Sequence, residues 1–180
     1  MTTTTTLERT VARVTDPSRR PGYTPDHVHA MVVEPGRWRE SDPFLMLAED
    51  WFGPGTFGPH PHRGFETVTL VLEGAVEHQD NHGGQGLLGP GDAQWMTAGR
   101  GVIHGEEPPA GQRAHVLQLW LNLPGALKMT EPRYQDLRAR EIPIRREPGA
   151  ELRVFSGTSG GVRGPALNHV PVTMVDLRVA

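Results

Sequence analysis

Apolar and polar residues alternate with a period of two in several short stretches of this chain. The clearest alternation runs over residues 117–123, where four leucines alternate with Gln118, Trp120 and Asn122. Successive side chains of a strand point to opposite faces, so this stretch predicts a strand with one leucine face. Further strands are predicted by the apolar, β-branched and aromatic residues of 42–47 (DPFLML), 65–72 (FETVTLVL) and 94–97 (QWMT).

Tight turns separate these predicted strands. The 180 residues include 22 glycines and 17 prolines, and stretches such as 80–84 (DNHGG) and 90–92 (PGD) are typical of hairpin tips and turns. Helical periodicity is scarce, and its best candidate is the short polar segment 134–140. The pattern predicts an all-β fold, a small β-barrel or double-sheet jelly roll that can enclose a small-molecule cavity.

The chain divides into three regions. Residues 1–8 contain a threonine run with no cationic or apolar segment, so we expect a disordered tail and not a secretory signal. Residues 9–142 hold most of the predicted strands, including one at 7–14 that begins inside the tail. Residues 143–180 begin with a proline-containing linker and add two predicted strands, at 152–155 and 172–177.

Charge and cysteine content exclude several classes of function. The net charge is −3 and the pI is about 6.3, so no basic surplus indicates nucleic acid or an anionic membrane as a partner. The chain has no cysteine, which excludes disulfides, thiolate chemistry, Fe–S clusters and zinc fingers. A cysteine-free chain is compatible with a reducing compartment, and we expect a cytoplasmic protein.

Two pairs of candidate metal ligands lie in the strand-rich region. His60 and His62 are two residues apart, and so are His104 and Glu106. Residues i and i+2 of a strand point to the same side, so four ligand atoms converge if the two strands are neighbours or face each other. Three imidazoles and one carboxylate suit a divalent transition metal such as Fe(II), Mn, Ni, Cu or Zn.

A competing pair is formed by His27 and His29 in the stretch HVHAMVV. No carboxylate and turn follow this pair in the same pattern. We therefore interpret it as part of a strand with one or two outward-facing histidines.

The long motifs around the ligand pairs resemble those of the pirin family within the cupin superfamily. The resemblance rests on HPHRGFETVTLVLEG, PGDAQWMTAGRGVIHGE, LQLWLNLP and EPRYQDL, and it is dense from Asp42 to Leu137. In the general cupin pattern, the glutamate of the first motif is a ligand. Here the first-motif glutamate is Glu66, and the later carboxylate at Glu106 matches the pirin arrangement.

The resemblance implies a fold, a metal and an activity. Pirins are bicupins with two β-barrels and a metal in the N-terminal barrel only, typically iron. The matching ligand positions are His60, His62, His104 and Glu106. Several pirins are quercetin 2,3-dioxygenases, whereas others are iron- or redox-dependent regulators that bind transcription factors or metabolic enzymes.

The region after residue 142 is short for a second cupin barrel. A complete barrel would need roughly a hundred more residues. We therefore expect the N-terminal half of a bicupin with an incomplete second barrel. Open strand edges and apolar surface favour a homodimer, in which a second chain supplies the missing half, or poor solubility.

As an enzyme, the chain would open the ring of a flavonol with O2. Glu106 would take the proton of the flavonol 3-hydroxyl. Candidate pocket residues are Phe44, Met46, Phe57, Trp95, Gln118 and Trp120, for which core packing is the alternative. Arg63 and Glu66 could orient the ligand histidines or form a surface ion pair.

Two other functions stay open at the level of sequence. The metal centre could act as a sensor without turnover, in a protein that binds a partner through a redox-dependent surface. A cupin isomerase or sugar-binding protein is the third possibility. A closed apolar pocket beside the metal would favour the enzyme, whereas a flat charged surface over the metal would favour the regulator.

Overall fold

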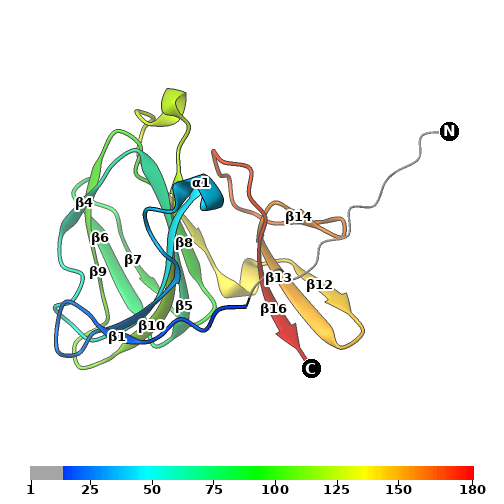
Figure 1. Cartoon of the computed structure of the whole chain (residues 1–180), viewed down its shortest axis with the longest axis horizontal. Helices are drawn as coiled ribbons and strands as arrows, with labels where there is room; N and C mark the ends of the chain where they lie inside the picture. Colours follow the sequence, from blue (N-terminus) through cyan, green and yellow to red (C-terminus); the bar gives the residue numbers. More distant parts are fainter. Residues whose placement is uncertain (1–13) are drawn as a thin grey trace.

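The structure is a computed structural model that describes residues 14–180, and within this range the chain is built almost entirely of strands (Figure 1). Its helical segments are one short α-helix, α1 (Trp38–Ser41), and two 3₁₀ turns, η1 (Gly125–Leu127) and η2 (Ala139–Glu141). No helix in this range is long and apolar enough to span a bilayer. The expected tail at 1–8 and nearly all of the expected strand at 7–14 lie outside the described residues.

Two antiparallel sheets form the main body, which occupies the left of Figure 1. The seven-stranded sheet contains, in spatial order, β1 (Arg20–Pro21), β2 (Val28–Val33), β3 (Phe44–Phe52), β10 (Ala114–Asn122), β5 (Phe65–Glu73), β8 (Ala93–Thr97) and β11 (Arg133–Leu137). The four-stranded sheet contains β4 (His60–His62), β9 (Val102–Glu107), β6 (Val76–Asp80) and β7 (Gln85–Leu88). This all-β, cupin-like arrangement agrees with the fold that the sequence predicts.

The leucine face of β10 lies on the outside of the seven-stranded sheet. Leu121 is completely buried there, and Leu117 and Leu119 pack against the same hydrophobic cluster. Gln118 and Trp120, the intervening residues, line a cavity on the other face of the strand. The period-two pattern therefore separates core from cavity correctly along this strand.

Residues 144–179 form two small sheets beside the main body, on the right of Figure 1. One contains β12 (Ile144–Glu147), β13 (Ala150–Ser156) and β16 (Met174–Val179), and the other contains β14 (Thr158–Ser159) and β15 (Val162–Arg163). Phe155 of β13 belongs to the same hydrophobic cluster as Val68 of β5 and Trp95 of β8. This segment thus packs on the outer face of the seven-stranded sheet.

The predicted helix at 134–140 is wrong. Residues 133–137 form strand β11, which pairs antiparallel with β8, and only 139–141 make a 3₁₀ turn. The segment is too short to be a stable helix by itself, whereas pairing with β8 satisfies its backbone groups. Tertiary hydrogen bonding therefore overrides a weak local helical pattern.

Candidate metal centre

Strands β4 and β9 are direct neighbours, as convergence of the two ligand pairs requires. His60 is the register partner of His104, and His62 is the partner of Val102. Along β9 the inward side chains are Val102, His104 and Glu106, all of them buried. The alternation of the strand thus places His104 and Glu106 on the same face of the sheet.

The three histidines form a compact cluster. One ring nitrogen from each of His60, His62 and His104 lies within 4.8 Å of the others. The ring centroids are 4.6–4.8 Å apart. His62 and His104 are buried, whereas His60 is partly exposed.

The hydrogen bonds of these rings leave lone pairs for a metal. His60 Nδ1 lies 2.7 Å from the Gly58 carbonyl oxygen, which can only accept a hydrogen bond, so Nδ1 carries the proton and Nε2 is free. His62 Nε2 and both ring nitrogens of His104 are shut off from solvent and have no hydrogen-bond partner within residues 14–180. Such orphaned polar atoms are rare in folded proteins, and a bound divalent metal would satisfy them.

The electrostatic environment keeps two of these imidazoles neutral. Burial, reinforced by the neighbouring imidazoles of His104 and His60, lowers the pKa of His62 to about 3. Burial and the neighbouring His60 and His78 lower the pKa of His104 to about 3 as well. Neutral imidazole is the form that ligates metals, so both rings are ready to bind at neutral pH.

Glu106 lies beside the histidine cluster but is held by other residues. The Thr69 hydroxyl donates to Glu106 Oε1 at 2.7 Å, and the Gln118 amide donates to Oε2 at 3.1 Å. Thr69 and Gln118 are cross-strand partners on β5 and β10. The carboxylate therefore joins the four-stranded sheet, which carries it, to the seven-stranded sheet.

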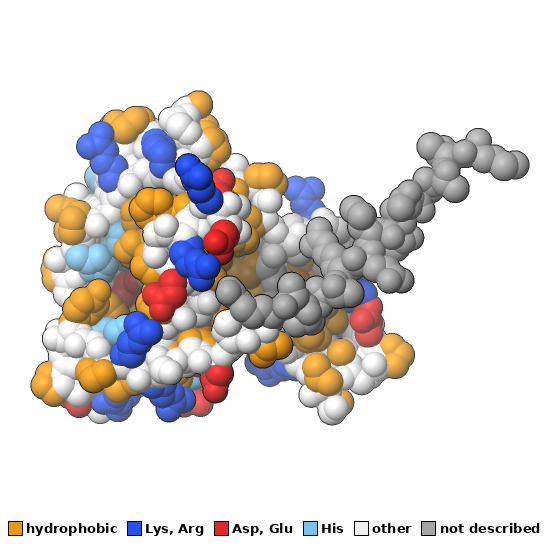
Figure 2. Space-filling view, in the orientation of Figure 1, with side chains coloured by type: hydrophobic (Ala, Val, Ile, Leu, Met, Phe, Trp, Pro, Cys, Tyr) orange, Lys and Arg blue, Asp and Glu red, His pale blue; other side chains and the backbone are white. Residues whose placement is uncertain are grey.

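A cavity of about 980 Å³ opens beside these residues. Its walls include Met46, Phe57, Trp120 and Gln118 from the predicted pocket set, together with His60, His62, Arg63, Thr69 and Glu106. Much of the lining is hydrophobic. Figure 2 views the main body from the side on which histidine side chains appear among hydrophobic ones.

Three predicted pocket or orienting residues lie elsewhere. Trp95 is completely buried in the outer hydrophobic cluster, because it faces away from the barrel interior as its partner Val68 does. Phe44 lies at the start of β3 and is partly exposed. Glu66 is fully buried but bonds to the hydroxyl of Thr97 at 2.7 Å and to no histidine.

Arg63 lies at the edge of the cavity and does not orient a histidine. Its guanidinium donates to the sulfur of Met129 at 3.4 Å in an exposed position. This contact is neither the histidine contact nor the surface ion pair that the sequence suggested.

The competing histidine pair does not face outward, contrary to the sequence interpretation. His27 is 2% exposed, and its Nε2 lies 2.9 Å from Asp50 Oδ1. The carboxylate comes from β3, 23 residues further along the chain, where no local pattern links it to the histidine. His27, His29 and Asp50 all line the same large cavity.

His78 was not identified from the sequence. It is an inward residue of β6, the register partner of Glu106, and its ring centroid is 5.5 Å from that of His104. In the part of the chain that the structure describes, both of its ring nitrogens are buried without a hydrogen-bond partner, although Nε2 is 3.6 Å from an Asp80 oxygen. The alternation in Val76-Glu77-His78 is the sequence signal that could have placed it on the inner face.

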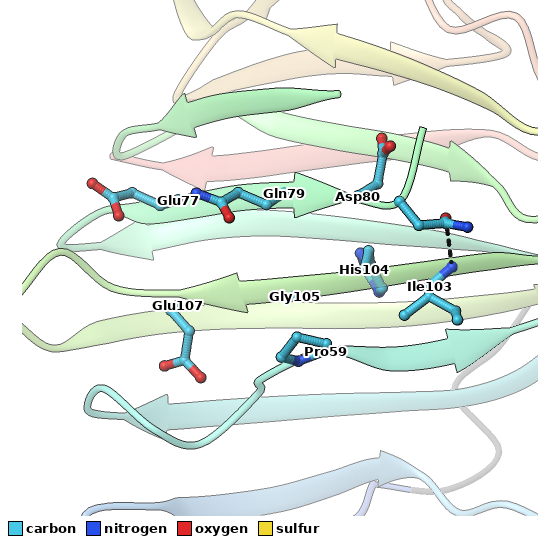
Figure 3. A pocket seen from close by; sticks show the side chains of 9 residues that line it. Pro59, Glu77, Gln79, Asp80, Ile103, His104, Gly105 and Glu107 are labelled. Carbon is cyan, nitrogen blue, oxygen red and sulfur yellow. Dashed lines mark hydrogen bonds between the residues drawn. The ribbon is translucent and has the colours of Figure 1, made fainter. Parts of the chain in front are cut away.

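The outer face of the four-stranded sheet is chemically different. Figure 3 shows Glu77 and Gln79 of β6 and Glu107 of β9 around a smaller depression of about 380 Å³, which His104 also lines. Asn81 Oδ1 accepts a hydrogen bond from the Ile103 amide at 3.0 Å at its edge. The strand alternation thus exposes Glu77 and Gln79 on the outer face and buries His78, His104 and Glu106 on the inner side.

Comparison with known proteins agrees with this geometry. The sequence profile of the Pirin family matches residues 23–121, more than half of the chain. The chain belongs to the pirin family. Human Pirin is 46% identical over 140 residues, which are 77% of this chain and 48% of the human protein.

Solved structures show the same relationship. A protein from Geobacillus kaustophilus is 56% identical, with a TM-score of 0.91, and the match covers 94% of this chain and 68% of that one. A quercetin 2,3-dioxygenase from Acinetobacter baumannii is 34% identical, with a TM-score of 0.74 over 89% of this chain and 62% of that one. The chain spans about half the length of the curated relatives it matches.

Proposed function

We propose that this pirin binds Fe(II) through His60, His62, His104 and Glu106 and acts as a quercetin 2,3-dioxygenase. The observation that carries the proposal is the histidine cluster with its unpaired nitrogens, of which His60 and His62 line a largely hydrophobic cavity. The quercetin 2,3-dioxygenase from Acinetobacter baumannii, which shares the fold and is 34% identical over the matched region, supports a flavonol and O2 as substrates. Homodimer formation stays a separate prediction.

Each residue has a role that its surroundings support. The bound metal would supply Lewis acidity that lowers the pKa of a substrate hydroxyl, and a redox centre for the reaction with O2. Glu106 would accept the hydroxyl proton at a carboxylate oxygen. Thr69 and Gln118 hold that carboxylate in place, so its position is set before the substrate arrives.

The cavity supports an enzyme in preference to a regulator without turnover. Its volume of about 980 Å³ lies at the upper end of the range for small-molecule pockets, about 300–1,000 Å³. Phe57 and Trp120 contribute aromatic side chains to its lining, against which a planar ligand can pack. A sensor that binds a protein partner over its metal would need no such space.

Metal content and oxygen consumption test the proposal together. Wild-type protein loaded anaerobically with Fe(II) is expected to hold one iron per chain by elemental analysis and to consume O2 when quercetin is added. His104→Ala removes one ligand and should lose most of its iron. His82→Ala, in the exposed tip between β6 and β7, is the matched control and should retain metal and activity.

The outcomes separate the parts of the proposal. Full iron content in His104→Ala would contradict the metal site. One iron per wild-type chain without oxygen uptake would contradict the dioxygenase and favour a regulator. Glu106→Gln that retains iron but consumes no O2 would support the role of Glu106 as the base.

A further inference from the structure

A second polar group lies in the cavity, on the seven-stranded sheet, whereas the histidine cluster lies on the four-stranded sheet. His29 of β2 and Asp50 of β3 are register partners, and their side chains line the cavity together with His27. Asp50 is 6% exposed, so a charged or strongly polar group is buried here amid hydrophobic side chains. The proposed metal centre does not use any of the three residues.

The hydrogen bonds of His27 define its tautomer. The Tyr23 backbone N–H donates to His27 Nδ1 at 2.9 Å, so Nδ1 is the acceptor. Nε2 must then carry the proton, which it donates to Asp50 Oδ1 at 2.9 Å. With both nitrogens occupied, His27 is not a metal ligand in this arrangement, and it positions Asp50.

Asp50 retains hydrogen-bonding capacity toward the cavity. Among residues 14–180 the hydrogen bond from His27 engages Asp50 only at Oδ1, so Oδ2 is available to a ligand. His29, the register partner of Asp50, also lines the cavity, and its Nδ1 is buried with no hydrogen-bond partner among the described residues. Unpaired buried polar atoms are rare in folded proteins, so this part of the wall is polar without being fully paired.

The spacing suits an aromatic ligand with polar groups at both ends. Asp50 is the register partner of Val116, and Gln118, two residues further along β10, touches Glu106. Diagonal positions of this kind lie about 7–8 Å apart on one face of a sheet. A molecule of two or three rings that reaches Glu106 with one end therefore extends toward Asp50 with the other.

We propose that Asp50, positioned by His27 and accompanied by His29, is a subsite that accepts a hydrogen bond from a phenolic hydroxyl on the part of the ligand remote from the metal. The proposed function supplies the identity of the full ligand, a flavonol, but the subsite itself rests on the residues of β2 and β3. Its role is to select hydroxylated aromatic ligands and to set their orientation in the cavity.

Phenol and benzene test the subsite without metal. In metal-free wild-type protein, phenol should bind about ten-fold more tightly than benzene in an NMR titration, because a hydrogen bond to a carboxylate is charge-assisted. Asp50→Asn keeps an oxygen for His27 but presents an amide N–H to the ligand, so the preference for phenol should fall to near one. A merely structural defect would weaken both ligands equally.

Glu49→Gln is the matched control. Glu49 neighbours Asp50 in sequence, but it pairs with His115 on the outer face of the sheet at 2.8 Å. The Glu49→Gln variant should prefer phenol over benzene as strongly as the wild type does. If Asp50→Asn fails to fold, NMR spectra of the wild type give a second test. Phenol, but not benzene, should then shift the imidazole resonances of His27 and His29.

Two flavonols distinguish failure of the subsite from failure of the proposed function. For the iron-loaded protein, Asp50→Asn should raise KM about ten-fold for quercetin. It should leave KM unchanged for a flavonol that has no hydroxyl on the ring remote from the metal. Equal wild-type affinities for phenol and benzene, or a variant that keeps the preference, would overturn the subsite even if quercetin is a substrate. A phenol preference in a protein that consumes no flavonol would leave the subsite standing and overturn the dioxygenase.

Discussion

At the scale of single residues, the histidine cluster makes stability depend on pH. Burial and neighbouring imidazoles lower the pKa values of His62 and His104 to about 3, from an ordinary value of 6.5. Below pH 6.5 these two histidines become protonated in the unfolded chain but stay neutral in the folded chain. The metal-free protein should therefore have its full stability above pH 6.5 and lose it as the pH falls toward 3, by up to about 1.4 kcal/mol per pH unit for each histidine.

Urea unfolding of metal-free protein at pH 7, 6 and 5 measures this dependence. His62→Gln should flatten the profile, because it removes one of the two titrating groups. The exposed His82 supplies the control, since His82→Gln should leave the slope as it is in the wild type. An unchanged slope in His62→Gln would show that this ring is not held neutral by the fold.

The same scale separates what the sequence can predict from what it cannot. The two-residue spacing of His60 and His62 places both on one face of any strand that contains them, and this does not depend on the tertiary structure. The bonds that hold Glu106 come from residues 37 and 12 positions away in the chain, and only strand pairing brings them together. The same limit applies to the His27–Asp50 pair, whose residues lie on adjacent strands.

At the scale of elements, a turn ties the two ligand strands together. Gly99 has a φ of +49°, and a Cβ at this position would lie 2.0 Å from the Thr130 carbonyl oxygen. Its own carbonyl accepts a hydrogen bond at 2.8 Å from the amide of Gly64, two residues after the end of β4. Gly99→Ala should therefore destabilise the fold by more than about 3 kcal/mol and reduce metal binding as well.

Chemical denaturation with a glycine control checks this expectation. Gly83 also has a positive φ, +86°, but no atom of the described residues lies within 4 Å of its Cβ position. Gly83→Ala should cost only about 1 kcal/mol. If both variants lose the same stability, backbone conformation alone explains the effect and the close approach of Thr130 contributes nothing.

Element prediction succeeded where a pattern was long and failed where it was short. The alternation over 117–123 defines a strand and assigns each face, because it repeats over several residues of one element. The segment 134–140 has no comparable repeat, and its structure is determined by pairing with β8, about 40 residues earlier in the chain. The local sequence pattern of 134–140 does not reveal this partner strand.

At the scale of the whole molecule, the segment after residue 142 contributes to the core of the main body. The sequence predicted two of its strands, although the second begins at Met174 and not at residue 172. Its packing was not predicted. Phe155 belongs to the same buried cluster as Trp95, which is therefore a core residue and not a cavity residue.

This packing predicts that the two parts unfold together. Phe155 is completely buried in the shared cluster, so Phe155→Ala should destabilise the entire chain by about 3–5 kcal/mol through the cavity that it leaves. Leu177, on the neighbouring strand β16, is 54% exposed, and Leu177→Ala should change stability by less than about 0.5 kcal/mol. Urea unfolding followed by both tryptophan fluorescence and circular dichroism should give one coincident transition that moves only with Phe155→Ala. A separate transition, or a barrel that unfolds at the wild-type midpoint in Phe155→Ala, would mean that the C-terminal strands add nothing to the stability of the metal-binding body.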